Sequence, residues 1–497
     1  MFSDEKVQKV PHLGLIFKVL LFVILIYYPF FLHLTSLPIY IYDEARVAVN
    51  AYEMYANKNY IVAHFGGLPD LYNTKPPLLL WLQVLGFKLF GVGELAVRLP
   101  SAVAAALTAV TVLGFSIRYL KSYWLGMIAV AVLVSSSGYV CEHVSRTGDY
   151  DALLTLFTTA YCFSYFAFLE TQKNKYLHLF FVLLLLVIFT KSIQGLMILP
   201  ALLLFALWQK QLLFVLKNKW VYINALLLIP IIATFFLLRE HYNAGYLKAV
   251  WENDLGGRFT DALDDHRQVF NWYYANLIWR YFKAWWWLVP ISLVLGFWQS
   301  DERTKKITVY LALIIAVYSL VISSAQTKLE WYDAPLFPFL SLLVAIGIHR
   351  FISIFTNIKI LGLSPIFKQT LAVLLFIAWF VLPYKSILTT IYTNKIYDWQ
   401  EPSFAMPFYL KAALEKGESL DKRAICYDEY TAVLQFYVGV ARERKQIITF
   451  KKSDSLATHD VVITSQAHIQ KNIERLYTVQ TATYPHGVNI YTIQAVK

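Results

Sequence analysis

Two pairs of acidic residues stand beside long apolar segments and are the first candidates for chemistry. Asp43 and Glu44 follow an apolar run in PIYIYDEARVA, and Asp149 and Asp151 come before another in SRTGDYDALLTLF. Such carboxylates could take a proton from an acceptor hydroxyl, cap a helix, or face the positive end of a helix dipole. Because one cap needs only one of the two residues at 149 and 151, we expect Asp43 and Asp151 to share a catalytic site.

The basic residues near Asp43 in the sequence lead us to assign it a different role from Glu44. Residues 45–56 carry apolar residues at helical spacing, so both carboxylates are predicted at or just before a helix start. For Glu44 we favour this capping role. For Asp43 we favour catalysis, because Arg46 lies three residues on and Lys75 precedes two prolines that fix the backbone as the chain returns to the membrane.

Several cationic residues follow in segments predicted on the same side of the membrane. Lys191 lies between two apolar runs, Arg258 follows a Gly-Gly pair, and Lys328 and Tyr332 stand just before a run marked by prolines. Each has an ordinary alternative: Lys191 could extend to lipid headgroups, and Arg258 could be a solvated loop charge. Taken together with Arg46 and Lys75, they form a cluster suited to holding a phosphate while a hydroxyl or phosphate attacks nearby.

The composition shows what must position these residues. The chain of 497 residues is 58% hydrophobic, and its mean hydropathy is +0.51. Its repeated apolar runs are long enough to cross a bilayer, which predicts a polytopic membrane protein. The net charge of +12 comes mostly from Lys and Arg in short loops, so it indicates topology and not nucleic-acid binding. The three cysteines show neither zinc-site spacing nor a disulfide framework.

The apolar runs and the basic loops together predict a helical domain over residues 1–390. Residues 76–90 are short and open with two prolines, so we expect them to lie along the membrane. Outer loops are predicted at 35–98 and 239–284. The positive-inside rule then gives about eleven spans, an odd number that places the C-terminus outside the cytoplasm. The spans are predicted near residues 13, 99, 123, 152, 177, 195, 220, 285, 307, 335 and 369.

The composition changes after the last predicted span. Residues 391–497 are charged and mixed, and short β-like runs such as KQIITF and DVVITS alternate with helix-like segments. This alternation predicts a small α/β domain on the non-cytoplasmic side. It contains no evident catalytic motif, so it could cover the site, select the acceptor or only add stability.

Six motifs in order carry a family resemblance: YDEARVA, KPPLLLW, GVGELAVRLPSA, SRTGDYDALLTLF, TKSIQGLMILP and KLEWYDAPLFPFL. They resemble the GT-C superfamily of membrane glycosyltransferases, and look closest to the branch of the aminoarabinose (lipid A) transferases and dolichyl-phosphate-mannose protein mannosyltransferases. The resemblance covers roughly residues 13–340. It implies an enzyme of the inner or plasma membrane that takes a sugar from a polyprenyl phosphate. The acceptor would be lipid A-like or another cell-envelope molecule on the periplasmic face, or alternatively a protein.

The resemblance also assigns roles to single residues. Asp43 and Asp151 match acidic residues of the family's first two outer loops, and Tyr332 matches a tyrosine near the donor. The positions that would hold the lipid-linked phosphate are Arg46, Lys75, Lys191 and Arg258. One departure concerns metal binding, because relatives commonly have Glu before Lys-Pro-Pro and this chain has Thr74. A divalent metal is therefore left open, with Asp149, Asp254 or His266 as substitutes for that glutamate.

Two other classes of protein fit part of these observations. A transporter or flippase of lipid-linked sugars would also have cations and carboxylates beside a lipid path, and a non-catalytic scaffold could share the fold. We find neither an inverted repeat nor paired broken helices, which are typical of transporters. A sugar on a lipid phosphate already carries a good leaving group, so an enzyme needs only to bind the growing phosphate charge and orient the acceptor.

Overall fold

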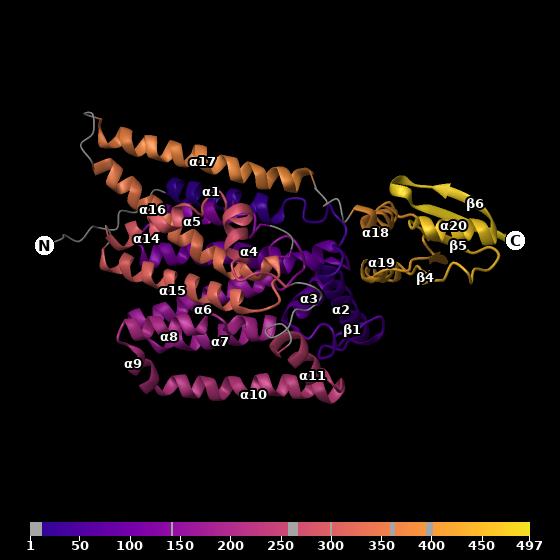
Figure 1. The fold of residues 1–497 in the computed structure, drawn as a ribbon, viewed down its shortest axis with the longest axis horizontal. Helices are drawn as coiled ribbons and strands as arrows, with labels where there is room; N and C mark the ends of the chain where they lie inside the picture. Colours follow the sequence, from indigo (N-terminus) through magenta and orange to yellow (C-terminus); the bar gives the residue numbers. More distant parts are fainter. Residues whose placement is uncertain (1–11, 141–142, 257–266, 299–300, 358–362, 394–400) are drawn as a thin grey trace.

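Long helices dominate the molecule and run side by side along its longest axis (Figure 1). The computed structural model describes residues 12–140, 143–256, 267–298, 301–357, 363–393 and 401–497. One end of the bundle is covered by α2 (Asp43–Asn57), α3 (Leu78–Phe90) and the C-terminal domain. We call this the capped end.

The long helices correspond to the predicted membrane spans. Among the described residues, eight candidate spans have mean hydropathies between 1.6 and 2.4, and about twenty residues suffice to cross a bilayer. They contain α1 (His12–Phe31), α4 (Glu94–Tyr119), α6 (Asp151–Thr171), α7 (Asn174–Lys191), α10 (Lys219–Tyr242), α15 (Glu302–Ser324), α16 (Phe337–Asn357) and α17 (Pro365–Thr393). Their number and apolar character confirm an integral membrane protein with the predicted helical fold.

Shorter apolar helices occupy the other predicted spans. These are α5 (Tyr123–Val134), α8 (Leu199–Trp208) and α14 (Leu288–Trp298). With the eight long helices, each of the eleven predicted positions has a helix among the described residues; that all eleven cross the membrane stays a prediction. α3 is also short and apolar, and the prediction that it lies along the membrane stays a prediction.

Small elements link the helices at the capped end. A two-residue turn of Gly66 and Gly67, both at positive φ, joins β1 (His64–Phe65) to β2 (Leu68–Pro69). Glycine suits this position because tight hairpin turns require positive φ. Other short helices are η1 (Ser192–Leu196), α11 (Tyr246–Val250), η2 (Trp251–Leu255), α13 (Trp272–Asn276), η3 (Leu277–Tyr281) and η4 (Glu330–Leu336). Of these, α11, η2 and η4 contribute residues to the candidate site.

The C-terminal domain is an α/β unit, as the alternating pattern predicted. Its five strands lie in the order β4-β3-β5-β7-β6; β3 is parallel to β4 and β5, and β7 is antiparallel to β5 and β6. The strands are β3 (Arg423–Ile425), β4 (Thr449–Phe450), β5 (Val461–Thr464), β6 (Tyr477–Thr483) and β7 (Asn489–Val496), and the helices are α18 (Glu401–Glu415), α19 (Ala432–Glu443) and α20 (Ala467–Leu476). The predicted boundary at residues 390 and 391 falls in the last turn of α17 and stays a prediction.

The C-terminal domain packs directly on the capped end. Residues of α2, α3, α18 and α19 share one apolar core. A Cβ at Gly439 of α19 would come within 2.6 Å of the Tyr52 ring on α2, so the glycine permits this close approach. Tyr437 donates a hydrogen bond to Glu94 at 2.7 Å, and Lys411 pairs with the same carboxylate at 3.2 Å. The domain therefore covers the polar end of the bundle and is held there by both apolar and charged contacts.

Candidate functional site

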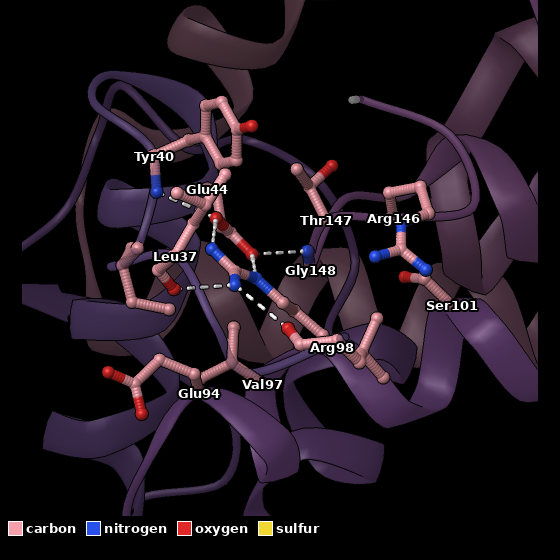
Figure 2. A network of polar contacts seen from close by, with 12 residues as sticks. Leu37, Tyr40, Glu44, Glu94, Val97, Arg98, Ser101, Arg146, Thr147 and Gly148 are labelled. Carbon is pink, nitrogen blue, oxygen red and sulfur yellow. Dashed lines mark hydrogen bonds and ion pairs between the residues drawn. The ribbon is translucent and has the colours of Figure 1, made fainter. Parts of the chain in front are cut away.

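Glu44 and Arg98 form a buried ion pair at the capped end (Figure 2). The guanidinium of Arg98 donates to both carboxylate oxygens, at 2.7 and 2.9 Å, and also to the carbonyls of Leu34, Leu37 and Pro38. The carboxylate accepts two further bonds, from the backbone N–H of Tyr40 and from that of Gly148.

This network ties three separate segments together: the chain entering α2, the start of α4, and the loop before α6. A buried charge is tolerated when it is paired and its remaining hydrogen-bonding capacity is satisfied. Glu44 fulfils both conditions and is 0% exposed. Glu44 stands at the helix start, as predicted, but its main partner is Arg98, 54 residues away, and its one bond to a near neighbour in the sequence is from the N–H of Tyr40.

Asp43 lies in a different environment from its neighbour. It is the first residue of α2 and leaves 46% of its side chain exposed. Its carboxylate lies 4.0 Å from Nδ1 of His143, which in turn lies 3.3 Å from the carboxylate of Asp149. The imidazole stacks on the ring of Trp331, with centroids 3.8 Å apart. His143 therefore stands between an exposed carboxylate and a buried one.

Asp149 is the buried end of this arrangement. It is 4% exposed and accepts a 2.6 Å hydrogen bond from Thr147. Burial by itself would raise the pKa of Asp149, but contacts with His143 and Thr147 and the charge of Lys191 lower the pKa below its ordinary value. Asp149 is thus ionised at neutral pH, and its carboxylate lies beside the imidazole of His143.

A second cluster joins three of the predicted residues. Nζ of Lys191, at the end of α7, lies 2.7 Å from both carboxylate oxygens of Asp151, at the start of α6. The ammonium also lies 5.0 Å from the ring centroid of Tyr332. Both charged side chains are buried, so Lys191 pairs inside the protein and does not extend to lipid headgroups.

Arg46 is held in a rigid frame on α2. It makes two hydrogen bonds to Asp70, at 2.9 and 2.7 Å, and its guanidinium lies 4.4 Å from the ring centroids of both Phe65 and Tyr72. Burial alone would raise the pKa of Asp70, but the contacts with Arg46 lower it below its ordinary value. The pair fixes one face of Arg46, and the side chain remains 20% exposed.

Lys75 meets a carboxylate that comes from far along the chain. Its ammonium lies 2.6 Å from Asp254 of η2, and the hydroxyl of Thr74 donates to the same carboxylate at 2.7 Å. Asp254 thereby brings an acidic group beside Lys-Pro-Pro, where this sequence has Thr in place of Glu. The sequence left Asp254 as one of three alternatives, and the structure shows its contact with Thr74 and Lys75.

The side chain of Lys328 donates hydrogen bonds to backbone carbonyls. Its ammonium donates to the carbonyls of Ala325 and Gln268, and the side chain is 4% exposed. Burial first, and then the charge of Arg267, lower the pKa of Lys328. Its predicted contact with substrate stays a prediction. Arg258 and His266 lie outside the described residues.

A segment from Asp70 to Lys75 connects the clusters. Asn73 donates to the hydroxyl of Tyr150, which lies between Asp149 and Asp151 in the sequence. From the other side, Arg239 donates to the carbonyl of Asp70 and Tyr246 donates to that of Thr74. The segment contacts Arg46 through Asp70 and carries Lys75 at its end. These two cations are thus held at fixed positions relative to the start of α6.

Sequence reasoning missed several residues of these clusters. Asp70 lies in the predicted outer loop at 35–98, between Arg46 and Lys75, and His143 lies six residues before Asp149. In both places the available signal was a titratable residue close to candidates already chosen. Asp333 of η4 is 1% exposed, and its carboxylate oxygens have no hydrogen-bond partner among the described residues. Its position next to Tyr332 was the available signal, but a buried carboxylate without donors has no sequence signature.

In the part of the chain that the structure describes, the side chains that could bind a metal do not form a metal site. No group of three or more His, Cys, Asp or Glu side chains is placed to hold an ion there. Asp149 and Asp254 are engaged with His143 and with Lys75. Cys162 and Cys426 are buried free thiols, and Cys141 lies outside the described residues.

The sequence is similar to those of known membrane glycosyltransferases. Residues 74–237 match the model of the dolichyl-phosphate-mannose-protein mannosyltransferase family. Over 331 residues the chain is 29% identical to an undecaprenyl phosphate-alpha-4-amino-4-deoxy-L-arabinose arabinosyl transferase of Aeromonas salmonicida, which covers 64% of this chain and 57% of the relative. The chain therefore spans a little over half the length of this curated relative.

Solved structures extend the likeness to nearly the whole fold. ArnT from Cupriavidus metallidurans bound to undecaprenyl phosphate matches with a TM-score of 0.66 at 14% identity, covering 95% of this chain and 97% of that chain. An oligosaccharyltransferase of Archaeoglobus fulgidus matches with a TM-score of 0.55 at 10% identity, covering 98% and 75%. These findings confirm the resemblance to GT-C membrane glycosyltransferases, the aminoarabinose transferases among them, and show that the chain has their fold.

Proposed function

We propose that this protein is a membrane glycosyltransferase that moves a sugar from a polyprenyl phosphate to a lipid A-like or other cell-envelope acceptor. One observation carries the proposal: the capped end carries exposed Asp43, and three of its cations, Arg46, Lys75 and Lys191, are held on fixed carboxylate partners. The likeness to ArnT bound to undecaprenyl phosphate supports the choice of donor. A protein acceptor, as in the mannosyltransferase family, is the second candidate.

The proposed reaction needs a base on one side of the sugar and cations on the other. Asp43 accepts the proton of an acceptor hydroxyl as the hydroxyl oxygen forms a bond to the anomeric carbon. The bond from that carbon to the phosphate oxygen breaks, and the leaving polyprenyl phosphate keeps the electron pair. A phosphate acceptor is already ionised, and Asp43 then serves to orient it.

The carboxylates behind the cations explain how charge can be held ready for the phosphate. Asp70, Asp254 and Asp151 fix the directions of Arg46, Lys75 and Lys191 before any substrate binds. A preorganised cation stabilises developing negative charge without reorganisation at the moment of reaction. Predicted donor-phosphate contacts of Arg258 belong to this proposal on the basis of the sequence alone.

We place the capped end, with the site and the C-terminal domain, on the periplasmic face. Basic residues in the short loops at the other end of the bundle support this orientation under the positive-inside rule. They include Lys173, Lys175, Lys210, Lys217, Lys219, Arg303, Lys305 and Lys306.

A turnover assay tests the proposal. Purified protein in lipid is given a radiolabelled undecaprenyl-phosphate sugar and a lipid A acceptor. We expect release of undecaprenyl phosphate together with labelling of the acceptor. Movement of the intact donor across the bilayer with no release of phosphate would identify a transporter and would contradict the proposal.

A further inference from the structure

The C-terminal domain contains a cleft that the proposed reaction does not use. Its volume is about 610 Å³, and residues that follow β3 and β4 line it together with one face of α20. We call it the C-terminal cleft. Its lining includes Tyr427, Asp428, Lys452, Asp454, Lys471 and Arg475.

The position of the cleft in the sheet favours ligand binding. β3 and β4 are parallel neighbours, and the chain crosses from β4 to β5 on the other side of β3. In open α/β sheets, ligands bind in the crevice outside the carboxyl ends of the strands. Residues 426–428 and 451–454 follow those ends and line the cleft.

The charges of the cleft are unbalanced in favour of cations. Four basic side chains, Lys451, Lys452, Lys471 and Arg475, stand against the two carboxylates of Asp428 and Asp454. Lys451 is satisfied by Asp460, and Asp428 pairs with His468 at 2.7 Å.

Two of the lysines could pair with the charge of a bound anion. Lys452 and Lys471 are exposed and make no ion pair among the described residues. Clefts lined by one sign of charge concentrate ligands of the other sign.

The cleft also offers groups that suit hydroxyls. Asn472 donates to Ser453 at 2.8 Å and so joins the two walls, and its own amide oxygen accepts from Arg475. Cys426 and Ile469 form a buried floor. Burial raises the pKa of Cys426 to about 12, so the floor is a neutral thiol and not a nucleophile.

We propose that the C-terminal cleft binds a phosphorylated saccharide. Lys452, Lys471 and Arg475 would hold the phosphate, and the Asp454 carboxylate would accept hydrogen bonds from sugar hydroxyls. Given the proposed function, on which this step rests, the saccharide is the phosphorylated head group of the acceptor. The domain then recruits the acceptor to the end of the bundle where Asp43 lies.

A binding measurement tests the ligand chemistry without any donor. Full-length protein in phosphatidylcholine nanodiscs is titrated by calorimetry with N-acetylglucosamine 1-phosphate, N-acetylglucosamine and inorganic phosphate. The test variant combines Lys452→Glu with Lys471→Glu. Its matched control combines Lys416→Glu with Lys445→Glu, two exposed lysines of the same domain that lie outside the cleft.

We expect the sugar phosphate to bind wild type and the control alike, and to bind the cleft variant about tenfold more weakly or worse. The unphosphorylated sugar should bind far more weakly than the sugar phosphate. Equal affinity of the cleft variant and wild type, or equal affinity for both sugars, would overturn the proposal.

The source of the saccharide is decided by a transfer assay. Added N-acetylglucosamine 1-phosphate should raise the apparent KM for the acceptor in wild type, and much less in the cleft variant. Transfer unaffected by the added compound would assign the cleft to a free sugar phosphate and overturn the acceptor assignment. If wild type transfers no sugar at all, the proposed function fails, while the calorimetric result on the cleft remains valid.

Discussion

Asp43 and Glu44 are adjacent in the sequence, yet their carboxylates differ in burial and in hydrogen bonding. The Glu44 region is closed: its carboxylate is fully buried, and both of its oxygens accept bonds from Arg98 and from backbone N–H groups. The Asp43 region is open: its carboxylate is 46% exposed and only approaches His143. The Glu44 carboxylate has no hydrogen-bonding capacity left for a substrate, whereas the exposed carboxylate of Asp43 has.

The comparison separates stability from chemistry. Glu44 and Arg98 hold three segments in place, so changing them should act on folding. Asp43, His143 and the cations around them face the region where substrate is proposed to bind, so changing them should act on turnover.

The largest effect on stability is expected from breaking the Glu44–Arg98 pair. Arg98→Met leaves a buried carboxylate without its partner, and losing one member of such a pair costs about 3 to 5 kcal/mol. Thermal unfolding of purified protein measures the loss. Arg118→Met is the matched control, because Arg118 lies on the same helix and is exposed. Equal unfolding temperatures for the two variants would mean that the closed region does not hold the fold.

Lys75→Ala should come next and should act on the donor. It removes a charged hydrogen bond to the phosphate, worth about 1.5 to 3 kcal/mol, so transfer should fall roughly tenfold to hundredfold. The unfolding temperature should fall less than in Arg98→Met, because Asp254 keeps the hydrogen bond from Thr74. Lys88→Ala, on α3 and exposed, provides the control. If both variants transfer sugar at the same rate, Lys75 is a structural partner of Asp254 only.

His143→Gln should lower kcat about tenfold, because it removes the imidazole that lies between the carboxylates of Asp43 and Asp149. The KM for the donor should stay unchanged, because His143 is proposed to position the base and not to hold phosphate. Steady-state kinetics across a pH series checks both statements. An unchanged kcat and pH profile in the variant would show that the imidazole only packs against Trp331.

The smallest effect concerns acid stability. Asp70 and Asp149 have pKa values lowered in the folded protein, so their stabilisation is fully present above the ordinary value of about 3.9 and is lost as pH falls through the folded values. Unfolding temperatures of wild type should therefore decline below about pH 4. Asp149→Asn should flatten this decline, and Glu443→Gln, an exposed control, should not. An identical acid profile in all three proteins would contradict the depressed pKa of Asp149.

Much of the fold could be predicted because apolar runs and basic loops have simple physical causes. The helical spans follow from the need to satisfy backbone groups in the bilayer, and the C-terminal α/β pattern follows from alternating periodicities. Helix α2 was predicted at residues 45–56 and spans Asp43–Asn57. These are properties of local sequence.

The site was harder because its pairings are long-range. The partner of Lys75 is Asp254, 179 residues away, and the partner of Glu44 is Arg98, 54 residues away. Sequence spacing carries no information about such contacts. The motifs placed Asp151, Lys191 and Tyr332 near one another, but only the structure shows that Lys191 is paired with Asp151.

The central claim is that the open carboxylate does the chemistry, and Asp43→Asn tests it most directly. This change keeps the size of the side chain and removes the charge, so a general base is lost while the fold is kept. We measure transfer from undecaprenyl-phosphate sugar to acceptor by protein of verified unfolding temperature, beside wild type and Glu44→Gln. The account predicts a loss of about 10²-fold or more for Asp43→Asn and a milder loss, per folded molecule, for Glu44→Gln. Near-normal transfer by Asp43→Asn would contradict it.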